Sequence, residues 1–354
     1  GALEAGAAKV EITPGLGMPM WGDAARLGRG ATGVHDPLYS RALFLDDGET
    51  RLFLVSVDLY MISDAFRKRV IEIMPEVVPA EHVILTATHT HGGPGGMEPR
   101  LEHRLAWGRF VPGLVEETAQ GIAESMRLAF ENRRRGAIGF SVAKHAGLSE
   151  HASIPGGPVD ERIGVVRVDD ADGNAIAILA CFSALPNNVP EQDRYLYTAD
   201  YPGLFNAALE KLASAGCVGF FLGGAAADQR IGSPDGKQGW AGMEAVSELL
   251  AVLVKGDANG IAGGEATLHV GYEEAAAPQS MVPESEPSGG VFQTLEINGL
   301  LLNFVPGVPQ LGLSQKLRAR ALARGYSAQF SVGPATGFLG YFASRARCGL
   351  DPVT

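Results

Sequence analysis

Long apolar runs rich in valine, isoleucine and leucine constrain the fold of this chain more than any other feature. The runs with the length of a β-strand are 38–47, 51–58, 82–89, 162–170, 175–182, 217–224, 266–272 and 299–307. Near-continuous apolar runs are typical of strands that are covered on both faces. Asp-Gly pairs at 47–48 and 172–173 predict hairpin turns between neighbouring runs.

Helical spacing of apolar residues alternates with these runs. The predicted helices are 62–76, 104–132, 202–215, 239–255 and 310–324. Hairpins mixed with helices predict an α/β (α+β) fold with mixed sheets flanked by helices. We expect one domain over residues 1–354. The segment 273–290, rich in Ala, Pro, Ser and Glu, is expected to form a surface loop that crosses over the site.

Composition narrows the classes of partner. The net charge is −11, from 29 basic and 40 acidic residues, which argues against a nucleic-acid partner. No apolar run reaches the roughly 18–20 residues that a transmembrane helix needs. We therefore expect a soluble protein with a small-molecule or lipid-like ligand. The sequence leaves its compartment open, either cytoplasmic or exported with a leader absent from this chain, and it leaves the oligomeric state open as well.

The candidate site begins at two histidines, His89 and His91, in "HVILTATHTHGGPGG" (82–96). Residues i and i+2 of a strand point to the same face, so the two imidazoles converge if the strand continues that far. Neutral imidazole is a good zinc ligand, and the glycines that follow permit close approach of a ligand. Asp58, which ends another apolar run, meets the histidines if the two strands are neighbours. A hydrogen-bonded polar cluster without metal is the alternative interpretation.

A set of ordered motifs extends over nearly the whole chain. They are "KVEITP", "HDPLYSRALFLDDGETRLFLVSVDL", "VILTATHTHGGPGG", "GPVDERIGVVRVDD", "TADYPG", "FFLGGAAADQ", "FVPG" and "FLGYF". Together they resemble the catalytic domain of the neutral/alkaline non-lysosomal ceramidases. The resemblance implies a zinc-dependent amidase that cleaves the N-acyl bond of ceramide. The chain is too short for the C-terminal β-sandwich domain that enzymes of this family can carry, so none is expected here.

The resemblance implies a zinc site made of two histidines, a glutamate and a tyrosine. The first histidine corresponds to His89 and the tyrosine to Tyr341 in "FLGYF". The second histidine position is Leu185 in "FSALPNN", and the glutamate position is Val308 in "FVPGVPQ". Aliphatic side chains have no lone pair to donate, so we expect zinc binding to be weak or absent.

The serine nucleophile of the family is also replaced. Aligned without gaps, "GGAAADQRIGSPDG" keeps Asp228 but places Arg230 at the serine position. Ser233 lies three residues later and substitutes for that serine only if the loop bulges. Asp200 in "TADYPG" precedes a predicted helix, where an N-cap role is expected, and the resemblance places it near the site.

Three hypotheses follow for the chemistry. In the first, the chain is catalytically silent and its old pocket binds a small molecule or lipid. In the second, it is an active hydrolase with a rearranged metal site drawn from His89, His91, Asp58 or Asp228. In the third, it is a metal-free enzyme with His91 as the base and Arg230 on an anionic substrate.

Overall fold

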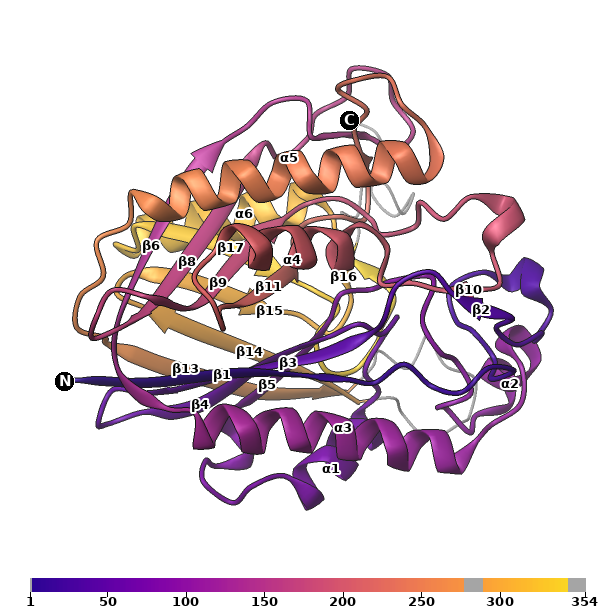
Figure 1. Cartoon of the computed structure of the whole chain (residues 1–354), viewed down its shortest axis with the longest axis horizontal. Coiled ribbons are helices and arrows are strands. Elements are labelled where there is room, and N and C mark those ends of the chain that lie inside the picture. Colours follow the sequence, from indigo (N-terminus) through magenta and orange to yellow (C-terminus); the bar gives the residue numbers. More distant parts are fainter. Residues whose placement is uncertain (1, 277–288, 343–354) are drawn as a thin grey trace.

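A mixed eight-stranded sheet forms the centre of the protein. The computed structural model describes residues 2–276 and 289–342. The strand order is β11-β9-β8-β6-β1-β3-β4-β5 (Figure 1). The strands are β1 (Leu3–Glu11), β3 (Tyr39–Asp46), β4 (Arg51–Val57), β5 (Val83–Ala87), β6 (Arg134–Lys144), β8 (Arg162–Asp170), β9 (Ala175–Phe182) and β11 (Val218–Gly223). The pairs β4–β5 and β9–β11 are parallel and the other pairs are antiparallel, which confirms the predicted mixed sheet and both hairpins.

A second, four-stranded sheet packs on one face of the first, with the order β13-β14-β15-β17. Its strands are β13 (Leu268–Ala276), β14 (Gly289–Ile297), β15 (Leu300–Phe304) and β17 (Ala328–Val332). Side chains such as Leu43 and Leu54 of the main sheet share a core with Leu295 and Phe330 of the second sheet. The loop predicted over 273–290 is wrong at both ends, because residues 273–276 and 289–290 belong to the β13–β14 ladder. Residues 277–288 lie outside the described part of the chain.

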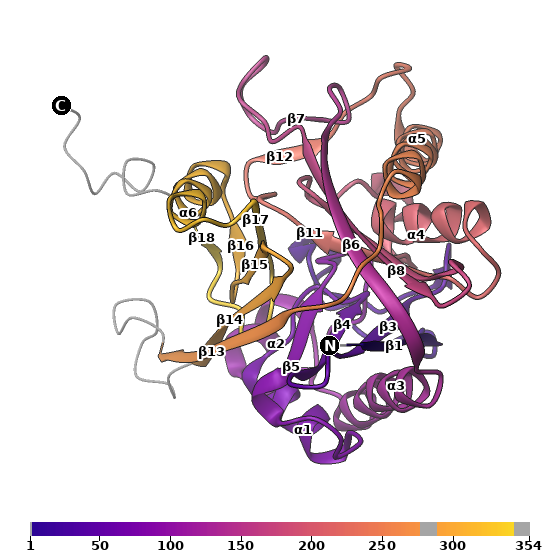
Figure 2. The ribbon, with the colours of Figure 1, turned by 90° about the vertical axis from the view of Figure 1, so that its left-hand side faces the viewer.

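Helices cover the outer faces of the two sheets (Figure 2). They are α1 (Asp64–Ile73), α2 (Leu101–Trp107), α3 (Pro112–Glu131), α4 (Asp200–Leu212), α5 (Gly239–Asn259) and α6 (Leu311–Ala323). α1 and α3 pack under β1, β3 and β4, whereas α4 and α5 pack over β8, β9 and β11. α6 packs against β17. The helix predicted over 104–132 is two helices, because Gly108 adopts a φ of 101° and Pro112 begins α3.

Three short ladders fasten the loops at one edge of these sheets. β2 (Gly33–Val34) pairs with β10 (Leu196–Tyr197), β7 (Ser149–His151) with β12 (Gln229–Ile231), and β16 (Val308–Pro309) with β18 (Tyr341–Phe342). Single-turn 3₁₀ helices lie at Ala24–Arg26, Ala80–His82 and Glu191–Asp193. Among the described residues, no helix combines the length and the apolar character that crossing a membrane requires.

The carboxyl ends of strands from both sheets meet at this edge. The amide of Ala87, the last residue of β5, donates to the Pro334 carbonyl oxygen at 2.9 Å, and the Gly333 amide after β17 donates to the Gly223 carbonyl oxygen of β11 at 2.9 Å. Ligand sites of α/β sheets lie outside the carboxyl ends of the strands. This edge therefore positions the candidate site.

Candidate functional site

His89 lies in the turn after β5, in a strained backbone conformation. Its φ is 66°, in the left-handed region that a non-glycine residue seldom adopts, and its amide donates to the Leu59 carbonyl oxygen at 3.0 Å. The buried imidazole places Nδ1 2.6 Å from the Tyr60 carbonyl oxygen and Nε2 3.2 Å from the Tyr341 hydroxyl oxygen. Because a carbonyl oxygen only accepts, Nδ1 carries the proton and Nε2 accepts from Tyr341.

His91 lies beside His89 with its ring turned nearly perpendicular to it. The ring centroids are 5.1 Å apart and the planes cross at 87°. β5 ends at Ala87, so the strand does not continue as far as the histidines, although the two rings still lie side by side. Tyr60 brings them together, since its ring lies 4.3 Å from that of His89 and 5.0 Å from that of His91.

The two histidines are neutral at pH 7. Burial lowers the pKa of His89 to about 3, and the neighbouring His91 adds to this effect. Burial also lowers the pKa of His91 to about 4. His91 donates from Nδ1 to the Gly22 carbonyl oxygen at 3.0 Å, so its Nε2 carries a lone pair. This buried Nε2 has no hydrogen-bond partner among the described residues.

Tyr341 and Val308 lie side by side. Val308 is the register partner of Tyr341 in the parallel β16–β18 ladder, and its side chain is buried. The structure thus brings together three of the positions named from the resemblance: His89, Tyr341 and Val308. Two of them carry electron-pair donors, and the third is aliphatic.

Leu185 follows β9 and lies on the His91 side of the site. It forms a bridge with Arg230, and its amide donates to the Gln229 carbonyl oxygen at 2.9 Å. The next residue, Pro186, accepts from the His91 amide at 3.2 Å. Leu185 supplies no donor atom from its side chain.

The donor set that remains does not fit a four-ligand zinc site. His89 and Tyr341 supply a nitrogen and an oxygen, whereas Leu185 and Val308 supply neither. Structural and catalytic zinc sites use at least three protein ligands. Over residues 2–276 and 289–342, no group of three or more His, Cys, Asp or Glu side chains is arranged to hold a metal ion.

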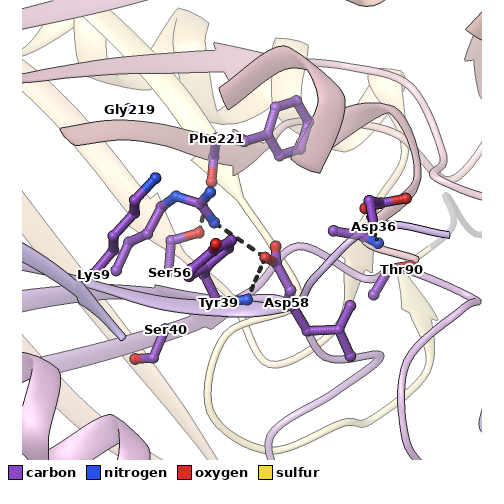
Figure 3. A network of polar contacts seen from close by, with 12 residues as sticks. Lys9, Asp36, Tyr39, Ser40, Ser56, Asp58, Thr90, Gly219 and Phe221 are labelled. Atoms are coloured by element: carbon purple, nitrogen blue, oxygen red, sulfur yellow. Dashed lines mark hydrogen bonds and ion pairs between the residues drawn. The ribbon is translucent and has the colours of Figure 1, made fainter. Parts of the chain in front are cut away.

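Asp58 binds a buried arginine. Its Oδ2 accepts from the Arg41 guanidinium at 3.0 Å and from the Tyr39 amide at 2.8 Å (Figure 3). Both side chains of this ion pair are almost completely buried. Asp58 therefore anchors the end of β4, next to the Leu59 and Tyr60 carbonyl groups that hold His89.

Asp200 is buried at the start of α4. The helix begins at this residue and its N-cap is Ala199, so the predicted N-cap lies one position away. The Asp200 carboxylate accepts from the backbone and side-chain amides of Asn188, each at 2.8 Å. Burial raises the pKa of Asp200 to about 6. These contacts tie α4 to the segment that follows Leu185.

Asp228, Arg230 and Ser233 follow β11 in the chain, and Arg230 lies in β12. Asp228 accepts from the Leu311 amide at 3.3 Å, at the start of α6. Arg230 is more than half exposed and pairs with Glu150 at 2.7 Å. The exposed Ser233 donates to the Lys237 carbonyl oxygen at 2.6 Å within its own turn. The side chains of Arg230 and Ser233 thus contact surface neighbours.

The sequence-based prediction did not identify two residues that lie at the site, Tyr60 and Arg26. Tyr60 packs on both histidines, and it follows a strand parallel to β5, so its position just after "VSVD" was a usable signal. Arg26 is 2% exposed and lies in a glycine-rich segment that offered no signal of burial. It lines a pocket of about 230 Å³ together with His91.

Comparison with known proteins gives consistent matches. Residues 4–216 match the sequence profile of the family Neutral/alkaline non-lysosomal ceramidase, N-terminal. A neutral ceramidase of Mycobacterium tuberculosis is 29% identical over 144 residues, which are 37% of this chain and 23% of the relative. A neutral ceramidase of Drosophila melanogaster is 25% identical over 197 residues, which are 51% of this chain and 28% of the relative. These matches span about a quarter of each curated relative.

The fold comparison covers more of the chain. The crystal structure of neutral ceramidase from Pseudomonas aeruginosa superposes with a TM-score of 0.84 at 19% identity. The match covers 97% of this chain and 69% of that one. At this identity the likeness establishes a shared fold, with the predicted helices and mixed sheets in a common arrangement.

Proposed function

Because the chain belongs to the neutral/alkaline non-lysosomal ceramidase family, we propose that it is a ceramidase-like hydrolase whose zinc site is degenerate. In this proposal the chain does not cleave ceramide by the family's zinc-dependent route, and its site holds an N-acyl amide or another small lipid-like ligand. The observation that carries the proposal is the buried Val308 beside Tyr341, where the resemblance places a glutamate.

The contacts of the remaining donors support this proposal. The His89 lone pair already accepts from Tyr341, which satisfies it without a cation. The aliphatic residue at 308 supplies no carboxylate of its own to neutralise a divalent ion at this pair. Charge and donor count therefore both disfavour zinc.

Restoring the donors tests the proposal directly. We expect less than stoichiometric zinc in the parent protein purified without chelator, measured by plasma mass spectrometry. The double variant Leu185→His/Val308→Glu should approach one zinc per chain, whereas the matched variant Leu185→Phe/Val308→Leu should remain like the parent. Circular dichroism checks that the variants are folded.

A ceramide cleavage assay gives a second test and defines the result that would contradict the proposal. The parent should release no sphingosine from ceramide with or without added zinc. Stoichiometric zinc in the parent, with sphingosine release that is lost after chelation and in His89→Ala, would overturn the proposal.

A metal-free hydrolase with His91 as the base is the second candidate. The lone pair on His91 Nε2, which has no partner among the described residues, favours it. A pKa of about 4 weakens it, because such an imidazole is a poor base at neutral pH. Turnover of N-acyl amides that survives chelation and is lost in His91→Gln would favour this candidate over a site that only binds its ligand.

A further inference from the structure

A small polar pocket opens beside His91. Its volume is about 230 Å³, below the roughly 300–1,000 Å³ of pockets for drug-sized ligands. The pocket is lined by Asp23, Arg26, His91, Asn187, Val189, Glu191 and Arg194. Its size and lining select a small polar ligand.

The two acidic residues of this pocket are directed to one of its two arginines. Arg194 lies 2.9 Å from the Glu191 carboxylate and 3.7 Å from that of Asp23. The Asp23 carboxylate also caps the short helix Ala24–Arg26 through the Ala25 amide at 2.9 Å. The charge of Arg194 is therefore compensated within the protein.

Arg26 has neutral partners instead. Its guanidinium donates to the Arg194 carbonyl oxygen and to the Trp21 carbonyl oxygen, each at 2.6 Å. No ion pair joins Arg26 to a carboxylate among the described residues, although Asp23 is near enough to act through space. Burial of this cation lowers its pKa to about 10, which reports the cost of removing it from water. An anion from outside the chain would offset that cost.

His91 places a second requirement on the ligand of this pocket, a hydrogen-bond donor. Its Nδ1 donates to Gly22, so its buried Nε2 can only accept. A buried acceptor without a partner costs about 1–3 kcal/mol. A ligand that satisfies it must donate a hydrogen from a hydroxyl or amino group.

We propose that this pocket binds a small carboxylic acid with a neighbouring hydroxyl or amino group, the carboxylate on Arg26 and the donor hydrogen on His91 Nε2. The inference goes beyond the proposed function, because the small polar ligand differs from the lipid-like one and its pocket is given by its own lining residues. It moves the anion-binding role from Arg230, which pairs with Glu150, to Arg26. It requires neither zinc nor turnover.

Three probes of nearly equal size separate the two requirements. Lactate has both the charge and the donor, propionate lacks the donor, and lactamide lacks the charge. Calorimetric titration should give about tenfold tighter binding of lactate than of propionate, the factor expected for one buried hydrogen bond, and no heat with lactamide. Equal binding of lactate and lactamide, or no binding of any probe, would overturn the proposal. Tighter binding of inorganic phosphate than of lactate would overturn the carboxylate assignment.

Variants then test the arginine. Arg26→Gln should weaken lactate binding at least tenfold, whereas Arg29→Gln, an exposed arginine of the same segment, should leave it within twofold. If Arg26→Gln does not fold, the ¹⁵N resonance of His91 Nε2 in the parent provides the test. Lactate should move it toward a hydrogen-bonded value and propionate should not, and an unmoved resonance contradicts the proposal. Zinc content and ceramide cleavage report on the proposed function separately, because neither measurement involves these probes.

Discussion

Losing either partner of the buried Arg41–Asp58 ion pair should destabilise the protein, and losing both should cost well below the sum of the two single losses. Both side chains are at most 2% exposed, so a partner left alone keeps its charge in a dry interior. Asp58→Asn leaves the Arg41 guanidinium without its carboxylate partner. The Glu210 carboxylate, 3.8 Å from the Arg41 Nε, still compensates part of this positive charge. We expect a loss of about 3 kcal/mol, at the lower end of the range for a broken buried pair.

Removing the arginine instead of the aspartate should lower the unfolding free energy further, by an amount that depends on pH. Arg41→Met leaves the Asp58 carboxylate with its hydrogen bond from the Tyr39 amide but without the arginine, and we expect a loss of about 4 kcal/mol at pH 8. Burial already raises the pKa of Asp58, and removing Arg41 raises it further. A folded-state pKa above the unfolded one makes stability fall as pH rises, so the loss should shrink toward pH 5, by at most about 1.4 kcal/mol per pH unit.

The double variant completes the cycle. Because Arg41→Met/Asp58→Asn leaves no charge buried in the pair, it should cost about 3 kcal/mol less than the sum of the single changes. Urea unfolding of all four proteins at pH 5 and pH 8 measures these free energies. Additive costs, or an Arg41→Met loss that is the same at both pH values, would refute the reasoning.

Two further predictions concern the site. Between pH 6.5 and 4 the unfolded chain binds a proton at His91 that the folded chain does not, because burial lowers the pKa of this imidazole to about 4, so its contribution to stability is lost as pH falls through this range. His91→Gln should therefore gain about 2 kcal/mol relative to the parent between pH 7 and pH 5 in urea unfolding, and an equal gain in the exposed His269→Gln control would contradict this. Gly22 has a φ of 91°, and a Cβ there would lie 2.8 Å from the His91 ring. Gly22→Ala should cost at least about 2 kcal/mol in unfolding free energy, whereas Gly15→Ala, with open space around it, should cost far less, and similar losses would argue against the clash.

The apolar runs predicted those strands whose side chains are bulky, and they missed others. β1 has the sequence LEAGAAKVE, whose alanines and glycine give little hydrophobic signal. It is nevertheless the strand that joins β6 to β3, and Gly6 is needed because a Cβ would lie 2.2 Å from the Ala129 carbonyl oxygen of α3. Close packing of a strand on a helix requires small residues, which sequence periodicity does not register.

At the site, strand neighbours were predictable and side-chain directions were not. Asp58 was placed near the histidines on the condition that its strand and theirs are neighbours, and the parallel β4–β5 pair meets that condition. Asp58 binds Arg41, however, and the ring beside both histidines is that of Tyr60. The 3.2 Å contact of His89 with Tyr341 joins residues 252 positions apart, so only the family resemblance pointed to it. The burial of Arg26 depends on backbone carbonyl groups of a loop, and side-chain patterns carry no record of those.

The hydrogen bonds that join Ala87, Pro334, Gly333 and Gly223 have a consequence for engineering. They run between main-chain atoms, so the relative placement of the strand ends does not depend on which side chains project from them. We therefore expect substitutions at Leu185 and Val308 to leave these main-chain hydrogen bonds in place. Metal-binding or catalytic side chains could be introduced at this edge a few at a time, because main-chain hydrogen bonds already fix the positions of the strand ends.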